Sequence, residues 1–188
     1  MKTVAAILFI SAFISINALS QIVSYEKGQI VTKNNDTIRA LVELTPTYEK
    51  YVSYKINNGA SIQRIKLNQI KSLETPYNLF LNVALAKEDL LFRLAVKGDP
   101  SLLVYSKVNM SNRSYSAYGG TIREGAPPTI IYAIRTIERD YIIYKKKDID
   151  QIQPLLENCP TALEVVNSKT FKLEDIEKVV NNLNNCNK

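Results

Sequence analysis

The chain has 188 residues, of which 46% are apolar and 22% are charged, as is usual for a folded protein with a sizeable core. Lys and Arg outnumber Asp and Glu by 24 to 18, which is a mild basic excess. The chain has no histidine and no tryptophan. The lack of histidine excludes Ser-His-Asp and Cys-His catalytic sites and removes the commonest metal ligand.

Residues 1–20 predict a signal peptide. Lys2 precedes an apolar run from Val4 to Ile16, and the small residues Ala18 and Ser20 stand at the spacing that a signal peptidase recognises. The run is shorter than the ~20 residues that a membrane-spanning helix needs, and the alternative is an uncleaved anchor or a buried helix. We expect cleavage after Ser20 and no later transmembrane span. The protein would then be exported, and periplasmic, associated with the outer membrane or extracellular.

Alternating apolar and polar side chains predict two β-hairpins in the first part of the exported chain. Residues 28–44 alternate around an Asn-Asn-Asp turn, and residues 51–67 alternate around Asn58-Gly59. Asn58 and Gly59 are expected to supply the positive φ angles of a tight turn. Residues 79–86 are nearly all apolar, which fits a buried strand or a short helix, and we favour the strand.

Two more hairpins are expected downstream. Residues 90–96 and 102–108 flank the turn-forming sequence Gly98-Asp99-Pro100. Residues 109–128 are rich in Ser, Asn, Gly and Pro and predict a long surface loop. The β-rich runs 129–137 and 139–146 form the last hairpin. The acidic segments Lys87–Leu90 and Ile137–Asp140 are interpreted as solvated turns rather than as paired catalytic carboxylates.

The hydrophobic period becomes helical after residue 147. Asp148 is expected to be the N-cap of a helix that starts at Ile149. Pro154 would interrupt the interior of that helix, so the alternative is a helix that begins near Pro154. A short helix is expected to start with Pro160 at its first position. The last helix, with Thr170 as its expected cap, carries one apolar stripe: Leu173, Ile176, Val179, Val180 and Leu183.

Cys159 and Cys186 are the only cysteines. In an oxidising compartment they predict one structural disulfide. Two cysteines without histidine make a poor zinc site, and a redox pair would be closer in sequence. The expected fold is therefore α+β. An antiparallel β-rich domain, a sandwich or open barrel of hairpins, covers residues 21–147, and a helical appendage tied by the disulfide covers residues 148–188. We expect no metal and no cofactor.

The long loop offers a candidate binding surface. Tyr115 and Tyr118 lie there beside Arg113 and Arg123, and exposed loop aromatics next to cations would form a contact patch for an envelope protein or a surface glycan. The other cations are scattered along the sequence apart from the run at 145–147, so nucleic-acid binding is not expected. The sequence leaves the oligomeric state open.

Three segments together resemble a family. "GQIVTKNNDTIRALVEL", "FRLAVKGDPSLLVYSK" and "LLENCPTALEVVNSKTFKLEDIEKVVNNLNNC" are similar to two hairpins and the closing helical segment of uncharacterised secreted and envelope proteins of Bacteroidota-type bacteria. The chain departs from that pattern at Asn35 and Ala40, where glycine is usual. The resemblance implies an envelope or secreted location and brings no catalytic residue.

These observations favour a non-enzymatic binding module of the cell envelope. One alternative is a structural accessory of an outer-membrane complex. The other is a carbohydrate-active or peptidoglycan-active enzyme that works without histidine, with two carboxylates in a pocket.

Overall fold

The computed structural model describes residues 24–45, 47–107 and 128–186, so the expected signal peptide lies outside the described residues. The strands are β1 (Tyr25–Thr32), β2 (Thr37–Glu43), β3 (Tyr51–Lys55), β4 (Gln63–Lys66), β5 (Ile70–Glu74), β6 (Leu79–Ala84), β7 (Asp89–Val96), β8 (Ser101–Lys107), β9 (Thr129–Arg135) and β10 (Asp140–Ile143). The helices are the 3-10 helices η1 (Leu67–Gln69), η2 (Lys146–Ile152) and η3 (Leu173–Asp175), and the α-helices α1 (Gln153–Leu156), α2 (Pro160–Asn167) and α3 (Ile176–Cys186).

All ten strands belong to one antiparallel sheet with the order β10-β9-β8-β7-β6-β5-β1-β2-β3-β4. The four expected hairpins are β1–β2, β3–β4, β7–β8 and β9–β10, and the apolar segment after residue 78 is the strand β6. The antiparallel fold with a helical C-terminal part is therefore confirmed. Strands β4 and β10 are the two edges, so the sheet is open.

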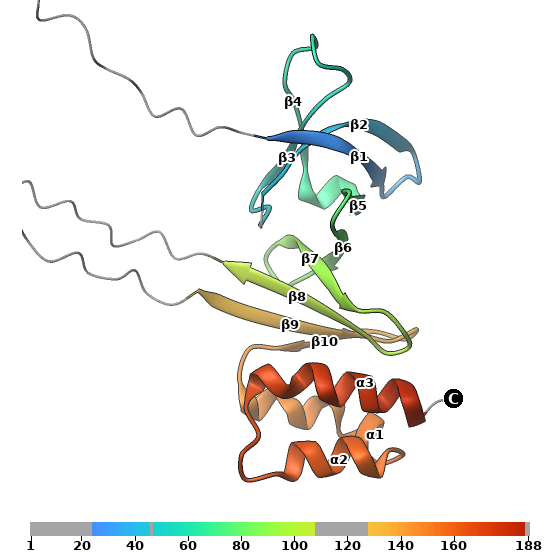
Figure 1. Cartoon of the computed structure of the whole chain (residues 1–188), viewed down its shortest axis with the longest axis vertical. Coiled ribbons are helices and arrows are strands. Elements are labelled where there is room, and N and C mark those ends of the chain that lie inside the picture. The colour runs from blue at the N-terminus through green and yellow to red at the C-terminus, as the bar shows by residue number, and fades with distance from the viewer. Residues whose placement is uncertain (1–23, 46, 108–127, 187–188) are drawn as a thin grey trace, which may run out of the picture.

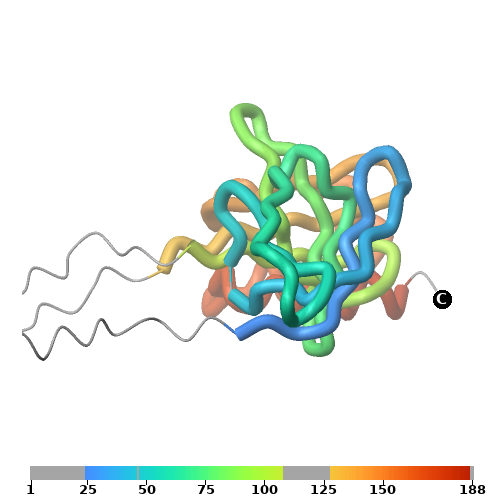
Figure 2. The backbone as a smooth tube through the Cα atoms, turned by 90° about the horizontal axis from the view of Figure 1, so that it is seen from above, coloured from blue at the N-terminus to red at the C-terminus, as the bar shows by residue number. Residues whose placement is uncertain are grey.

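The sheet folds over on itself and makes three layers with the helices (Figures 1 and 2). Strand β9 shows the reason, because its side chains alternate between two cores. Ile131 and Ala133 join the first core, between the two halves of the sheet, while Tyr132 and Ile134 join the second core, against the helices. The sequence of a strand that is buried on both faces is a continuous apolar run, and β9 has such a sequence.

Strand β5 has no counterpart among the expected strands, and a β-bulge explains why. Val31 pairs with Ser72 and Thr32 pairs with Ile70, so Lys71 is the extra residue in the ladder with β1. As a result Ile70 and Leu73 are both fully buried although they are three residues apart. Strict alternation, which places every second residue on one face, does not detect such a strand.

The turn expected at Asn58-Gly59 is wrong in its details. The connection between β3 and β4 spans residues 56–62, and Gly59 does not have a positive φ angle. The side-chain oxygen of Asn57 closes the turn instead, because it accepts a hydrogen bond from the Gly59 N–H at 3.0 Å. Among the described non-glycine residues, the one in the left-handed region is Asn35 in the β1–β2 turn, at φ 67°.

Asp148 and Thr170 do not occupy the N-cap positions expected of them, whereas the alternative of a helix that begins near Pro154 is confirmed by α1. The N-cap of η2 is Lys145, and the Asp148 carboxylate reaches back from the first turn to accept the N–H groups of Tyr144 and Lys145 at 2.9 Å. Thr170 does not cap the last helical segment, because η3 starts after Lys172, whose N–H donates to Asp175 at 3.0 Å. In both places an aspartate inside the first turn satisfies the free backbone donors in front of it.

The expected disulfide is confirmed. Cys159 and Cys186 are joined at an S–S distance of 2.08 Å, which ties the residue before α2 to the end of α3. Pro160 occupies the first turn of α2 as expected. Helix α3 buries the apolar stripe Ile176, Val179, Val180 and Leu183. Among the described residues, no helix is long and apolar enough to cross a membrane.

Candidate binding site

The outer face of strands β1–β4 gathers cations from four strands. Ile30 and Val42 point into the first core, so the odd-numbered residues of β1 and β2 point away from it. The strand register extends this face onto β3 and β4, because Leu41 pairs with Lys55 and Ser53 pairs with Arg64. We call this surface the basic face: Lys27, Arg39, Lys55, Arg64 and Lys66, with Tyr25 and Tyr51, and with Glu43 opposite Tyr25 as its carboxylate on β2.

Two tyrosine rings hold cations on the basic face. The Lys55 ammonium lies 4.5 Å from the centre of the Tyr25 ring, and the Arg64 guanidinium lies 4.4 Å from the centre of the Tyr51 ring. Such contacts attract the cation to the ring without neutralising it. Partial burial and the nearby Glu43 carboxylate raise the pKa of Tyr25, although Arg64 acts in the opposite direction. Because the rings do not neutralise Lys55 and Arg64, their positive charges remain available to a ligand.

The cations of the basic face also lack acidic partners within the described part of the chain. The salt bridges among the described residues join Lys33 to Asp89, Arg135 to Asp140, and Lys178 to Asp175. None of them uses a residue of the basic face. Surface cations that are not paired internally can pair with an external anion at little cost.

A groove of about 660 Å³ lies on β1 and β2, between the β3–β4 connection and the β5–β6 turn. This volume is within the range of small-molecule sites. Lys27 and Arg39 line the groove, and Glu74 is the one carboxylate among its lining residues. Gly28 is required at this point because a Cβ there would lie 2.7 Å from the Glu74 carbonyl oxygen, where β5 approaches β1 closely.

A second hollow, of about 330 Å³, lies at the β2–β3 connection and is lined by Glu43 and Glu49. Tyr48 also lines it and donates its hydroxyl to the Glu43 carbonyl at 2.7 Å. Burial raises the pKa of Tyr48 to about 12, so this hydroxyl stays protonated near neutral pH. Glu49 is exposed to solvent, whereas the acid of a glycoside hydrolase is normally enclosed. The enzyme alternative requires an enclosed carboxylic acid, and this hollow does not enclose Glu49.

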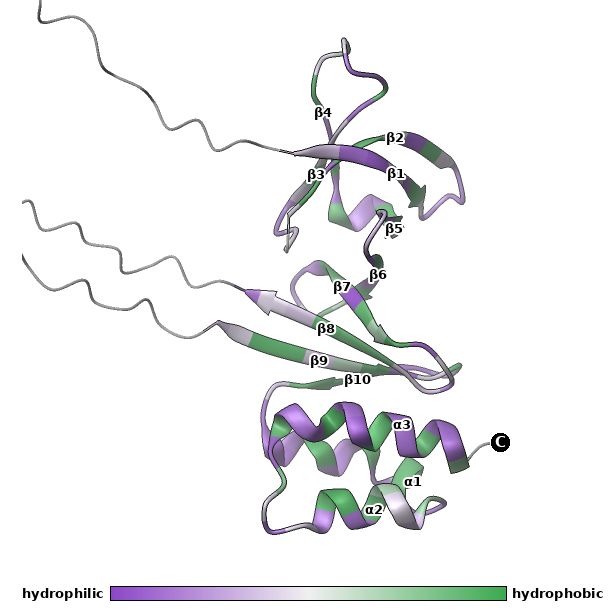
Figure 3. Ribbon diagram, viewed as in Figure 1, coloured by the Kyte–Doolittle hydropathy of each residue, from purple (hydrophilic) through white to green (hydrophobic). Residues whose placement is uncertain are grey.

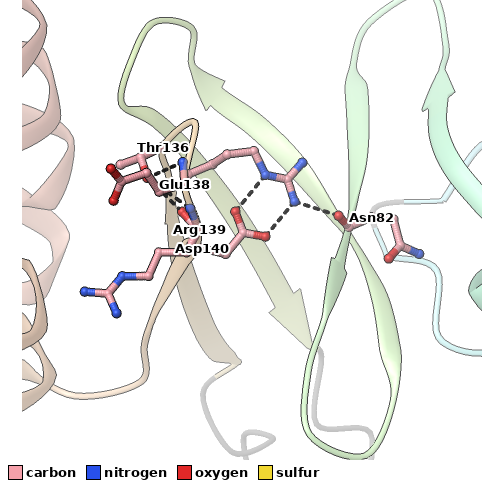
Figure 4. Close-up of polar contacts among 6 residues, drawn as sticks. Asn82, Thr136, Glu138, Arg139 and Asp140 are labelled. Carbon is pink, nitrogen blue, oxygen red and sulfur yellow. Dashed lines mark hydrogen bonds and ion pairs between the residues drawn. The ribbon is translucent and has the colours of Figure 1, made fainter.

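The acidic segments interpreted as solvated turns are turns, with residues 86–88 and 137–139 exposed, whereas Asp89 and Asp140 begin the strands that follow and pair with cations. The Arg135 guanidinium donates twice to Asp140 at 2.7 Å and once to the Asn82 carbonyl at 2.7 Å (Figure 4). This contact ties β9 to β6, which are not neighbours in the sheet. Asp89 pairs with Lys33 at 3.2 Å. Both carboxylates have structural partners, and neither lies beside the groove.

The structure and the sequence select different site residues. The expected binding loop residues Tyr115, Tyr118, Arg113 and Arg123 lie outside the described residues. Sequence reasoning missed the basic face, although the alternation of Lys27 and Gln29 with core residues was a signal for it. Among the described residues, no group of three or more acidic or cysteine side chains could hold a metal ion.

Comparison of the chain with family models, with curated proteins and with solved structures gives no match. The basic face and its groove are therefore the features from which a function can be derived. Together they combine positive charge without a salt bridge to any described residue, two tyrosine rings and a recess of ligand size.

Proposed function

We propose that this protein is an exported, non-enzymatic binding module that holds an anionic glycan of the cell envelope on its basic face. The main support for this proposal is that five cations share one sheet face without a salt bridge to any described residue. Charged side chains that converge on one surface attract a ligand of opposite charge and orient it.

Three observations support export. Residues 1–20 have the pattern of a signal peptide. The disulfide between Cys159 and Cys186 is of a kind that persists in oxidising compartments. The chain also resembles secreted and envelope proteins of Bacteroidota-type bacteria.

The chemistry of the surface favours a glycan over a bare anion. Tyr51 is 40% exposed and Tyr25 is half-buried, and such rings present an apolar body with a polar tip, which suits the faces and hydroxyls of sugars. The amide side chains of Asn57 and Asn58 line the groove and can both donate and accept hydrogen bonds.

A protein partner is the second candidate, and it rests on a different observation. Ile56 and Ile62, at the two ends of the β3–β4 connection, are 52% and 54% exposed. Apolar side chains at the rim of a charged surface suit a protein interface better than a sugar. A structural accessory of an outer-membrane complex would bind through these residues.

The test is titration calorimetry of the purified protein with anionic and neutral polysaccharides. The double variant R64Q and K66Q removes two charges from the basic face. The double variant K145Q and K147Q removes two exposed charges from the other end of the molecule and is the matched control. We expect the first variant to weaken binding of the anionic polymer about tenfold or more, and the control to change it less than about twofold.

Equal losses in the two variants, or no binding of any anionic polysaccharide by the wild-type protein, would refute the proposal. Binding that is lost instead in an I56S and I62S variant, measured on cross-linked envelope extracts, would favour the protein partner. Release of shortened oligosaccharides during the titration would identify a hydrolase, and E43Q and E49Q would then be the variants to test.

A further inference from the structure

Lys27 and Arg39 form a pair of like charges within the groove. Arg39 pairs with Gln29 across the β1–β2 ladder, and Lys27 pairs with Leu41, so the two cations are diagonal neighbours on the same face. Diagonal side chains on a sheet have Cβ atoms about 7 Å apart. Neither cation forms a salt bridge with a described residue. Two such charges repel one another, and an anion bound between them would relieve the repulsion.

The position of Glu74 restricts where that anion can lie. Glu74 pairs with Gln29 on the side of β1 opposite to Arg39. Across the sheet the order is therefore Arg39, Gln29, Glu74. A bound anion would be attracted by Arg39 and repelled by Glu74, so it would sit over β2 and leave the β5 side of the groove to neutral groups.

Uncharged polar and apolar side chains complete the groove. Asn57 uses its side-chain oxygen to accept the Gly59 N–H, which leaves its NH₂ group as a donor. Asn58 lines the same wall, and Pro76 supplies apolar surface. A bare ion would not need these groups. A sugar ring needs amides for its hydroxyls and apolar surface for its C–H face.

We infer that the groove is the subsite for a carboxylated sugar unit, such as a uronic acid, within an anionic glycan. The Arg39 guanidinium pairs with the carboxylate through two parallel hydrogen bonds, and Lys27 supplies the second positive charge. Gln29, Asn57 and Asn58 bind the hydroxyls. This inference rests on the proposed function and names the ligand group that one part of the basic face recognises.

The experiment is calorimetric titration of the purified protein with tri-galacturonate and with its methyl ester, which keeps the sugar but removes the charges. We expect the ester to bind about tenfold or more weakly, and R39Q to reduce affinity for the acid by a similar factor without changing affinity for the ester. R39K should recover only part of the loss, because an ammonium cannot form the bidentate pair. The control variant K147Q should change the affinity less than about twofold.

The outcomes separate the subsite from the proposed function. If R64Q and K66Q weaken binding of an anionic polysaccharide while R39Q and K27Q do not, the basic face binds glycans but the carboxylate subsite is wrong. If the wild-type protein binds no anionic glycan, both proposals fail. If inorganic phosphate or sulfate competes as strongly as tri-galacturonate, the groove is a simple anion site and the sugar assignment is overturned. A melting temperature within about 2 °C of wild type shows that R39Q is folded.

Discussion

Strands β1 and β9 show how coverage of a sheet decides where charge can accumulate. Strand β9 lies between two cores and buries Ile131 and Ala133 on one face, and Tyr132 and Ile134 on the other. Strand β1 buries Ile30 on one face only, and its other face is open. Figure 3 shows the result, because β9 is mostly hydrophobic and β1 carries a hydrophilic stretch.

The helices cause this difference. Helices α1–α3 cover the end of the sheet that contains β7, β8, β9 and β10 (Figure 1). A strand under the helices must be apolar on both faces, whereas β1–β4 tolerate lysine and arginine on the uncovered face. The covered end therefore has two buried faces, whereas the uncovered end buries one face in the first core and leaves the other as the surface on which we place binding.

The largest expected effect tests whether β8 is covered on both faces. Leu102 and Leu103 are neighbours that point into opposite cores, and they are 1% and 0% exposed. L102A and L103A should each lower the free energy of unfolding by about 2–5 kcal/mol, because each leaves a cavity. Urea denaturation measures the loss. L41A, on the half-buried outer face of β2, is the control and should cost less than either; a negligible loss in one of the pair would show that its face is not covered.

The next effect concerns the disulfide that closes the helical end. The double variant C159S and C186S opens a loop with a sequence separation of 27 residues. In the chain-entropy model this lowers the free energy of unfolding by about 3–4 kcal/mol. Guanidinium denaturation with and without reductant checks the value, because reduced wild-type protein should match the variant. Glycan affinity should stay within about twofold of wild type; a large fall would mean that the two ends are coupled.

A pH dependence follows from Tyr48, whose pKa is raised by burial from 10.0 to about 12. Below pH 10 the hydroxyl is protonated in both states, so its full contribution to stability is present. Between pH 10 and 12 the unfolded chain loses the proton while the folded chain keeps it, and stability falls by about 1.4 kcal/mol per pH unit. Y48F should therefore lose stability less steeply than wild type over this window, as measured by urea denaturation. Equal slopes would contradict the burial of this hydroxyl.

A smaller loss is expected at the contact between β9 and β6. R135Q removes the hydrogen bonds to Asp140 and to the Asn82 carbonyl, whereas D140N leaves the second of these intact. Because both side chains of the ion pair are partly exposed, R135Q should cost about 1–2 kcal/mol and D140N less. Urea midpoints of the two variants provide the comparison, with K87Q in the exposed β6–β7 turn as the control. The reverse order would show that the bond to Asn82 contributes nothing.

The smallest effect on stability is expected on the basic face itself. R64Q and K66Q remove exposed charges without opening a cavity, so the melting temperature should move by about 2 °C or less. Differential scanning calorimetry checks this against the large losses at L102A and L103A. A drop of many degrees would mean that the cation–π contact of Arg64 with Tyr51 holds the strands together, and the assignment of this face to binding rather than to stability would be wrong.

The local elements could be predicted from the sequence because their signals are local. Alternation in β1 and β2, the turn residues at Gly98-Asp99-Pro100 and the apolar stripe of α3 each act within a few residues of one another. The capping residues were not predicted correctly, because Asp148 could equally precede a helix or reach back from its first turn, and Thr170 could equally cap the helix or lie in the loop before it. Only the observed backbone shows which arrangement forms.

The chain by itself determined the hairpins, the helical end and the one possible disulfide, since Cys159 and Cys186 have no competing partners. Only the tertiary structure decided the bulge in β5, the two cores and the basic face. Lys27, Arg39 and Arg64 are far apart in the sequence, where they read as scattered charges. The register of four strands places them on one face, and the helices, which cover the other end of the sheet, leave that face open. Both are non-local properties, because each depends on which segments pair rather than on the residues within any one of them.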